Sequence, residues 1–268
     1  MLLSPLVNAY IRKGYSDRLA AAKVAQDIIL LKISKSKLNQ NITIKGGVIL
    51  HHISNDIRRS TIDIDIDFIK YSIEDEYIMK FIDSLNEIPD GITVNLVSGI
   101  VELRHDDYYG KRIVISLTDK NEYQILTKLD IGVLGNTQLQ QEKYNFRIEL
   151  LNEVAILFAN SKEEIIAEKL KSLLKFSFTS TRYKDIFDIY YLINHGVIDI
   201  KKLKHYIQMI IIDKKIASIE RYQDILNILE KTFKNKTYIS RLSNPNNNWL
   251  EIPVDQIIES IKDYFKKI

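Results

Sequence analysis

Residues 62–68 restrict the fold more than any other stretch, because isoleucine and aspartate alternate through them before a phenylalanine closes the run. Successive side chains of a β-strand point to opposite faces of its sheet. We therefore predict a strand over 62–69 with its isoleucines facing a core and Asp63, Asp65 and Asp67 on the other face. The sheet that contains this strand must have one apolar and one polar side.

The three aspartates have two interpretations. They can be the polar side of an ordinary half-buried strand, although Asp is depleted in strands and like charges on one face repel. Alternatively, carboxylates roughly 6–7 Å apart suit a pair of Mg²⁺ ions. Gly46 and Gly47 follow a predicted strand over 42–45, and such a turn would let phosphate groups approach backbone N–H groups. The spacing alone allows either Asp63 with Asp65 or Asp65 with Asp67 as the metal pair.

Composition excludes several classes of protein. The chain has 268 residues, of which 46% are hydrophobic and 27% charged, as expected for a globular protein with one large or two smaller domains. It has no cysteine, so disulfide and thiolate chemistry are excluded and a cytoplasmic location is favoured. The N-terminus does not resemble a signal peptide and the apolar runs are too short to cross a bilayer, so we expect no membrane association.

The pattern of elements predicts an α/β half followed by a helical half. Helices are expected over 17–34, 48–54 and 74–85, and strands over 93–97, 101–105, 111–117, 124–131 and 145–150. Beyond residue 150, helices are expected over 162–176, 183–194, 201–213, 219–233 and 254–267. We therefore predict a mixed β-sheet flanked by helices in a domain over 1–150, and an α-helical domain over 151–268.

Three further elements offer candidate site residues. Asp130 lies near the end of a predicted strand, Lys169 lies on the first helix of the second half, and Arg182, Lys184 and Asp185 lie at the start of the next helix. Each has an ordinary structural explanation: a turn, a surface lysine, or an acid that complements the helix dipole. The segment 201–241 contains ten Lys or Arg and four Asp or Glu, a net charge of +6. This charge is compatible with a solvated helix face or with a surface that binds a polyanion.

Taken together, these motifs resemble the AbiEii/AbiGii toxin family, a branch of the DNA polymerase β-like nucleotidyltransferases. The pattern is GG, R-x-T-x-D-I-D, L-D-I-G, A-E-K-L and R-x-K-D-x-x-D, in this order between about residues 20 and 195. The matching residues are Gly46, Gly47, Arg59, Thr61, Asp63, Asp65, Asp130, Ala167, Glu168, Lys169, Arg182, Lys184, Asp185 and Asp188. The offsets of Arg59 and Thr61 favour Asp63 and Asp65 as the metal pair.

The resemblance implies a Mg²⁺-dependent nucleotidyltransferase acting as the toxin of a toxin–antitoxin or abortive-infection system. It implies transfer from an NTP to RNA, in some relatives to the 3′ end of tRNA, and an antitoxin partner. Asp63, Asp65 and Asp130 would hold metal, with Asp130 also the general base. Gly46, Gly47, Lys169, Arg182 and Lys184 would bind nucleotide in a cleft that the helical domain completes, and Asp185 would orient Lys169 or contact the base.

The chain departs from the family pattern at two places. Val48 stands where Ser or Thr usually follows the glycines, and His51 or His52 stands where Arg is frequent. Two other functions therefore remain open: an impaired module that only binds nucleotide or RNA, and transfer to a protein hydroxyl group.

Overall fold

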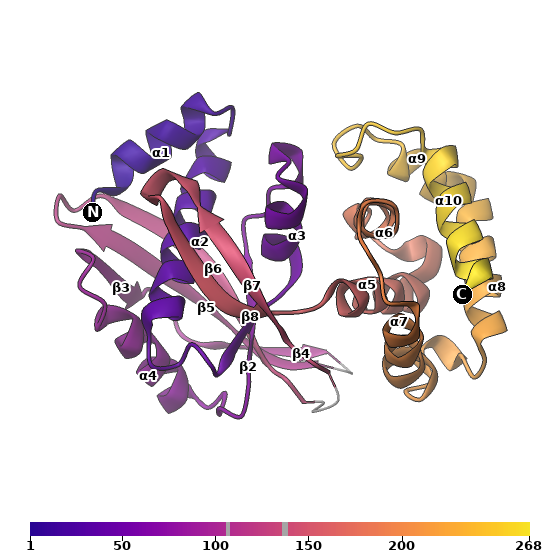
Figure 1. The fold of residues 1–268 in the computed structure, drawn as a ribbon, viewed down its shortest axis with the longest axis horizontal. Helices are drawn as coiled ribbons and strands as arrows, with labels where there is room; N and C mark the ends of the chain where they lie inside the picture. Colours follow the sequence, from indigo (N-terminus) through magenta and orange to yellow (C-terminus); the bar gives the residue numbers. More distant parts are fainter. Residues whose placement is uncertain (106–107, 136–138) are drawn as a thin grey trace. The chain divides into compact units, whose positions relative to one another are not determined.

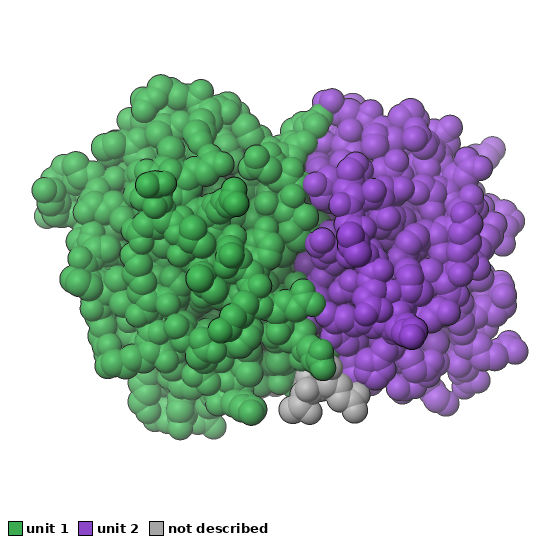
Figure 2. Space-filling view, in the orientation of Figure 1, with its two compact units in different colours: residues 1–160 green, residues 161–268 purple. Residues whose placement is uncertain are grey.

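The computed structural model of the chain describes residues 1–105, 108–135 and 139–268. It divides into two compact units, Met1–Asn160 and Ser161–Ile268, which Figure 2 colours separately. The predicted α/β half and helical half correspond to these units, but the division follows Asn160 rather than residue 150. The difference comes from strand β8 (Glu153–Ala159), which pairs with two strands of the first unit.

In the described part of the first unit, eight strands form one mixed sheet with helices packed on it (Figure 1). The elements are α1 (Leu3–Arg12), α2 (Asp17–Lys35), β1 (Ile42–Ile44), α3 (Gly46–Ser54), η1 (Ile57–Arg59), β2 (Ile64–Phe68), α4 (Asp75–Asn86), β3 (Ile92–Leu96), β4 (Val101–His105), β5 (Tyr108–Asp119), β6 (Gln124–Val133), β7 (Glu142–Ile148), η2 (Glu149–Leu151) and β8. The strand order is β3-β5-β6-β2-β1-β8-β7, with β4 beside β5. Strand β2 runs parallel to β6 and antiparallel to β1.

Alternation along β2 separates a buried face of the sheet from a polar one, as predicted. Ile64 and Ile66 are fully buried, and their register partners on β6, Leu129 and Ile131, are buried with them. Helix α2 packs against β6 and β8, and α4 packs against β3 (Figure 1). Asp65, between the two isoleucines, therefore points to the face opposite this core.

The second unit is helical throughout its described residues. Its elements are α5 (Lys162–Phe176), η3 (Ser177–Thr179), α6 (Lys184–His195), α7 (Ile200–Ile207), η4 (Gln208–Ile212), η5 (Ile216–Ser218), α8 (Tyr222–Lys234), α9 (Lys236–Leu242) and α10 (Val254–Lys267). The Ser161 side chain accepts a hydrogen bond from the Glu164 N–H and starts α5 where the sequence predicted. Helices α6 and α7 both pack against α5.

Several elements differ from the expectations. The predicted helix over 201–213 is divided into α7 and a π-helical segment, η4, and the helix predicted over 219–233 begins at Tyr222. Helices α1 and α9 and strand β8 were not predicted. Pro5 lies in the first turn of α1, where its missing N–H has no intrahelical partner to lose. Among the described residues, no helix is both long enough and apolar enough to cross a membrane.

Candidate active site

Gly46 and Gly47, at the start of α3, lie in close contact with strand β2 and the residues just before it. Gly46 has a φ of +61°, and a Cβ built on it would overlap Oδ2 of Asp65. A Cβ on Gly47 would lie 2.8 Å from Cβ of Thr61. The N–H of Lys45 donates to the Asp65 carbonyl at 2.9 Å. Gly46 is required because its backbone is left-handed. Both positions also require glycine because Asp65 and Thr61 occupy the space that a Cβ would take.

Asp65 and Asp130 lie side by side on neighbouring strands. They are register partners in the parallel pair β2–β6, and each is partly exposed. Partners on adjacent strands point to the same face of a sheet, with backbones about 4.8 Å apart. The structure therefore places Asp130 on the polar face with Asp65, as predicted. Asp63 immediately precedes β2 and is also partly exposed.

Arg112 on β5 is a component of this face that the motifs did not identify. Its Nε donates to Oδ1 of Asp130 and its Nη2 to Oδ2, both at 2.6 Å. The hydrogen bond to Asp130 raises the pKa of Arg112 above its usual range, and the charges of Asp63 and Asp65 add to the effect. In the described part of the chain, no three His, Cys, Asp or Glu side chains form a group that could hold a metal ion. Arg112 occupies both oxygens of Asp130.

Asp67 belongs to a different pair. Its Oδ2 lies 2.8 Å from Nζ of Lys45, and the residue is 3% exposed. Asp65 instead borders the Gly46 turn and Asp130. The choice of Asp63 with Asp65 as the metal pair stays a prediction.

The residues at the two departures from the family pattern are packed inward. Val48 is fully buried. His51 Nε2 lies 3.0 Å from the Tyr15 hydroxyl and Nδ1 lies 3.1 Å from the Asp56 carbonyl, while His52 stacks edge-on against Phe146. Burial lowers the pKa of His51 to about 4 and that of His52 to about 2, and the charge of Lys23 adds to both shifts. Neither imidazole is a cation at pH 7.

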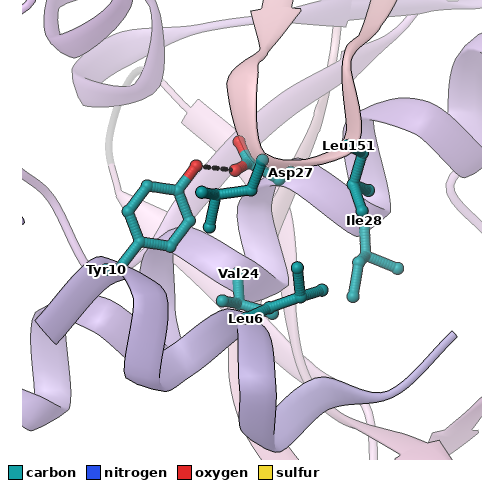
Figure 3. A pocket seen from close by; sticks show the side chains of 7 residues that line it. Leu6, Tyr10, Val24, Asp27, Ile28 and Leu151 are labelled. Carbon is teal, nitrogen blue, oxygen red and sulfur yellow. Dashed lines mark hydrogen bonds between the residues drawn. The ribbon is translucent and has the colours of Figure 1, made fainter. Parts of the chain in front are cut away.

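Tyr15 also connects His51 to a buried polar cluster between α1 and α2. Tyr10 packs edge-on against Tyr15 and donates to Oδ2 of Asp27 at 2.5 Å (Figure 3). Asp27 also forms an ion pair with Lys23, and the two residues are 3% and 7% exposed. The small cavity beside Asp27 in Figure 3 is lined mainly by aliphatic side chains. The Tyr10–Asp27 hydrogen bond links α1 to α2.

In the second unit, the predicted residues form one buried ion network. Nζ of Lys169 on α5 lies 2.5 Å from Oδ1 of Asp185 and 2.8 Å from Oδ2 of Asp188, both on α6. Arg182 Nε lies 2.8 Å from Oδ2 of Asp185, and Trp249 Nε1 donates to Oδ1 of Asp188 at 3.1 Å. Lys169 is 6% exposed and Asp188 is fully buried. Asp185 is therefore a direct partner of Lys169, whereas the Arg182 side chain is 62% exposed.

The sequence matches the family described as nucleotidyl transferase AbiEii toxin, type IV TA system, over residues 28–237. The chain belongs to this family. It is therefore a nucleotidyltransferase of a class that acts as the toxin of type IV toxin–antitoxin systems. The match confirms the resemblance based on the motifs.

One solved structure similar to this AbiEii-family chain is the crystal structure of an antigenic nucleotidyltransferase-like protein from Paracoccidioides brasiliensis. It has 18% sequence identity and a TM-score of 0.45, and the alignment covers 82% of this chain and 99% of that one. The comparison with curated proteins finds no match.

We expect Gly46→Ala to displace Asp65. The variant should lose much of its transfer rate while it stays folded, with only a modest loss of unfolding free energy. The left-handed backbone should cost about 1–2 kcal/mol in unfolding free energy, and the new methyl group would occupy the position of Asp65 Oδ2. Urea unfolding and initial transfer rates measure the two effects. Gly99→Ala is the matched control, because a Cβ there meets no atom within 4 Å. Equal activity of the two variants would contradict the role of the Gly46 turn.

We expect Lys169→Met to lower the unfolding free energy by about 3–5 kcal/mol, because it removes the buried ammonium that pairs with both Asp185 and Asp188. Lys171→Met on the same helix is the control, since that residue is only half buried. Urea unfolding measures the difference. A loss below about 1 kcal/mol would show that the network is not held by Lys169.

We expect stability to fall below pH 6.5 because folded His51 resists protonation. An unfolded histidine takes up a proton near pH 6.5, whereas the folded imidazole does so near pH 4. The contribution of His51 to stability is therefore complete above pH 6.5 and is lost as the pH falls toward 4, by on the order of 2 kcal/mol at pH 5. Burial of His52 adds a loss in the same direction. The measurement is urea unfolding at pH 7 and pH 5. His51→Gln should reduce the pH dependence, while His205→Gln, at an exposed position, should retain it.

Proposed function

We propose that this protein transfers a nucleotide from an NTP to the 3′ end of an RNA, with tRNA as the acceptor, in a Mg²⁺-dependent reaction. The observation that carries the proposal is the contact of the Gly46 turn with Asp65, beside Asp130. This contact joins a backbone turn suited to phosphate with carboxylates suited to a hard cation. The family assignment supplies the reaction class.

The chemistry of these residues suits magnesium. Asp63, just before β2, and Asp65, on its polar side, are partly exposed carboxylates, and Mg²⁺ prefers carboxylate and water oxygens. Asp130 would add a third carboxylate if Arg112 moved away. When bound, the cation would neutralise charge on the transferring phosphate and favour ionisation of the acceptor hydroxyl.

The other residues would position the nucleotide and move one proton. Gly46 and Gly47 would present backbone N–H groups to the β- and γ-phosphates. Asp130, once free of Arg112, would accept the proton of the acceptor hydroxyl as a general base. The oxygen of the acceptor hydroxyl would then attack the α-phosphorus of the NTP, and pyrophosphate would leave with the electrons of the broken P–O bond.

The second unit would contribute positive charge and bind the acceptor. We propose that Lys169, oriented by Asp185, supplies positive charge for nucleotide binding, and that Arg182 and Lys184 assist in it. The ion pairs of Lys169 support the orienting role of Asp185 over contact with the base. Exposed basic side chains of segment 201–241 would hold RNA phosphates; they include Lys201, Lys204, Lys214, Lys231, Lys236 and Arg241.

The test is incubation of the protein with Mg²⁺, each α-³²P-labelled NTP, and total RNA or RNA-free cell lysate. Label on RNA that 3′-end sequencing assigns to tRNA supports the proposal. Label on protein would make a protein hydroxyl the acceptor. No label with any NTP, combined with measurable NTP or RNA binding, would show a module that binds without transfer. The buried Val48 gives a specific reason to include this third outcome, because the position lacks a hydroxyl.

A further inference from the structure

Three side chains form a continuous row across the polar face of the sheet. Arg112 is the register partner of Asp130 in the antiparallel pair β5–β6, and Asp130 is the register partner of Asp65 in the parallel pair β6–β2. Neighbouring strands are about 4.8 Å apart, so the guanidinium and the two carboxylates occupy adjacent positions on one face. The row ends at Gly46, which touches Asp65.

The Arg112–Asp130 pair has strong geometry at an accessible place. Both carboxylate oxygens accept hydrogen bonds at 2.6 Å, one from Nε and one from Nη2. The side chains of Arg112 and Asp130 are 40% and 17% exposed. The bidentate geometry strengthens the pair, while its exposure lets solvent and a competing cation reach both partners. Strands β5 and β6 are also paired along nine residue positions, so the sheet does not depend on this ion pair alone.

A cation at Asp130 and the guanidinium of Arg112 compete for the same carboxylate. Arg112 donates to both oxygens of Asp130, and its positive charge repels a second cation on either oxygen, so each weakens the binding of the other. The charges of Asp63 and Asp65 also attract Arg112, which therefore neutralises part of the acidic face. Lys45, which precedes α3, forms an ion pair with Asp67.

We propose that Arg112 is a built-in counter-cation that competes with a divalent metal ion for Asp130, and that it binds a phosphate group of the NTP once displaced. The proposal rests on the proposed function, in which metal and NTP meet on this face. A guanidinium is suited to both states, because its fork of N–H groups matches a carboxylate and a phosphate equally well. Arg112 would thus couple entry of metal at Asp130 to arrival of the triphosphate.

The proposal predicts opposite changes in two affinities when the guanidinium is removed. In Arg112→Gln without nucleotide, Mn²⁺ should bind about tenfold more tightly, because a competing positive charge is lost. The same variant should bind the Mg²⁺ complex of an α,β-methylene NTP about tenfold more weakly, because a phosphate contact is lost. Arg112→Lys, which keeps the charge without the fork, should show smaller changes in both. Isothermal titration calorimetry measures all these dissociation constants.

Arg147→Gln is the matched control, because it removes the same charge from an exposed position on β7 of the same sheet. If Arg112 only joined β5 to β6, Arg112→Gln and Arg147→Gln would bind Mn²⁺ and NTP equally, and the inference would be overturned. It would also be overturned if both affinities of Arg112→Gln changed in the same direction. Opposite shifts in a protein that labels no RNA would support the inference while the proposed transfer reaction failed.

Discussion

Asp65→Asn should lower the rate of nucleotide transfer by about 10³-fold or more, with the protein still folded. Asp65 is the carboxylate that borders the Gly46 turn and is the register partner of Asp130. The substitution keeps the shape of the side chain but removes its charge, so the site loses a ligand for the cation that stabilises the transferring phosphate. Loss of a single electrostatic contact to a transition state costs about 10²–10³-fold, and a lost metal ligand should cost at least as much. Initial rates with labelled NTP and RNA measure the effect.

Asp67→Asn is the matched comparison on the same strand. Asp67 is 3% exposed and bridged to Lys45, so its substitution should reduce stability while changing the rate per folded molecule much less. Asp83→Asn, at an exposed position on α4, controls for net charge. Urea unfolding of each variant separates misfolding from lost chemistry. If Asp67→Asn lost as much activity per folded molecule as Asp65→Asn, the metal pair would be Asp65 with Asp67.

Features that depend on neighbouring residues were predictable from the sequence. The alternation of 62–68 correctly separated the buried isoleucines from Asp65 because the period of a strand is a local property. The Gly46 turn was predictable for the same reason, since few other residues tolerate its backbone conformation. The capping residue Ser161 likewise placed the start of α5.

Features that depend on strand register were not predictable. The strand that contains Arg112 was expected over 111–117, but nothing in its sequence indicates that Arg112 lies opposite Asp130. A shift of one residue would place the guanidinium on the buried face, so the pairing becomes visible only in three dimensions. Strand β8 was missed because a short apolar run is compatible with either a strand or a buried helix. The expected boundary at residue 150 therefore lies before β8, whereas the compact units divide after Asn160.

The motif residues of the second unit show a different limitation. The pattern that contains Lys169, Asp185 and Asp188 identified residues that do lie together. It did not show that Lys169 would be buried between two carboxylates. Such an arrangement gives Lys169 a structural role in addition to the proposed role in nucleotide binding. For this reason Lys169→Ala is a poor test of chemistry, and substitutions at Asp65 are better ones.

Expression of the wild-type protein without an antitoxin should arrest bacterial growth, and expression of Asp65→Asn should not. The family acts as the toxin of type IV systems, and we attribute the arrest to nucleotides added to RNA 3′ ends. An enzyme about 10³-fold slower needs about 10³ times longer to modify the same number of RNA molecules, so normal RNA turnover should prevent arrest. The measurement is growth after induction at equal protein abundance, with 3′-end sequencing of tRNA from the same cultures. Asp83→Asn should remain toxic, which excludes a general effect of the charge change. Equal toxicity of wild type and Asp65→Asn, with unmodified RNA ends in both, would mean that binding arrests growth and that transfer does not.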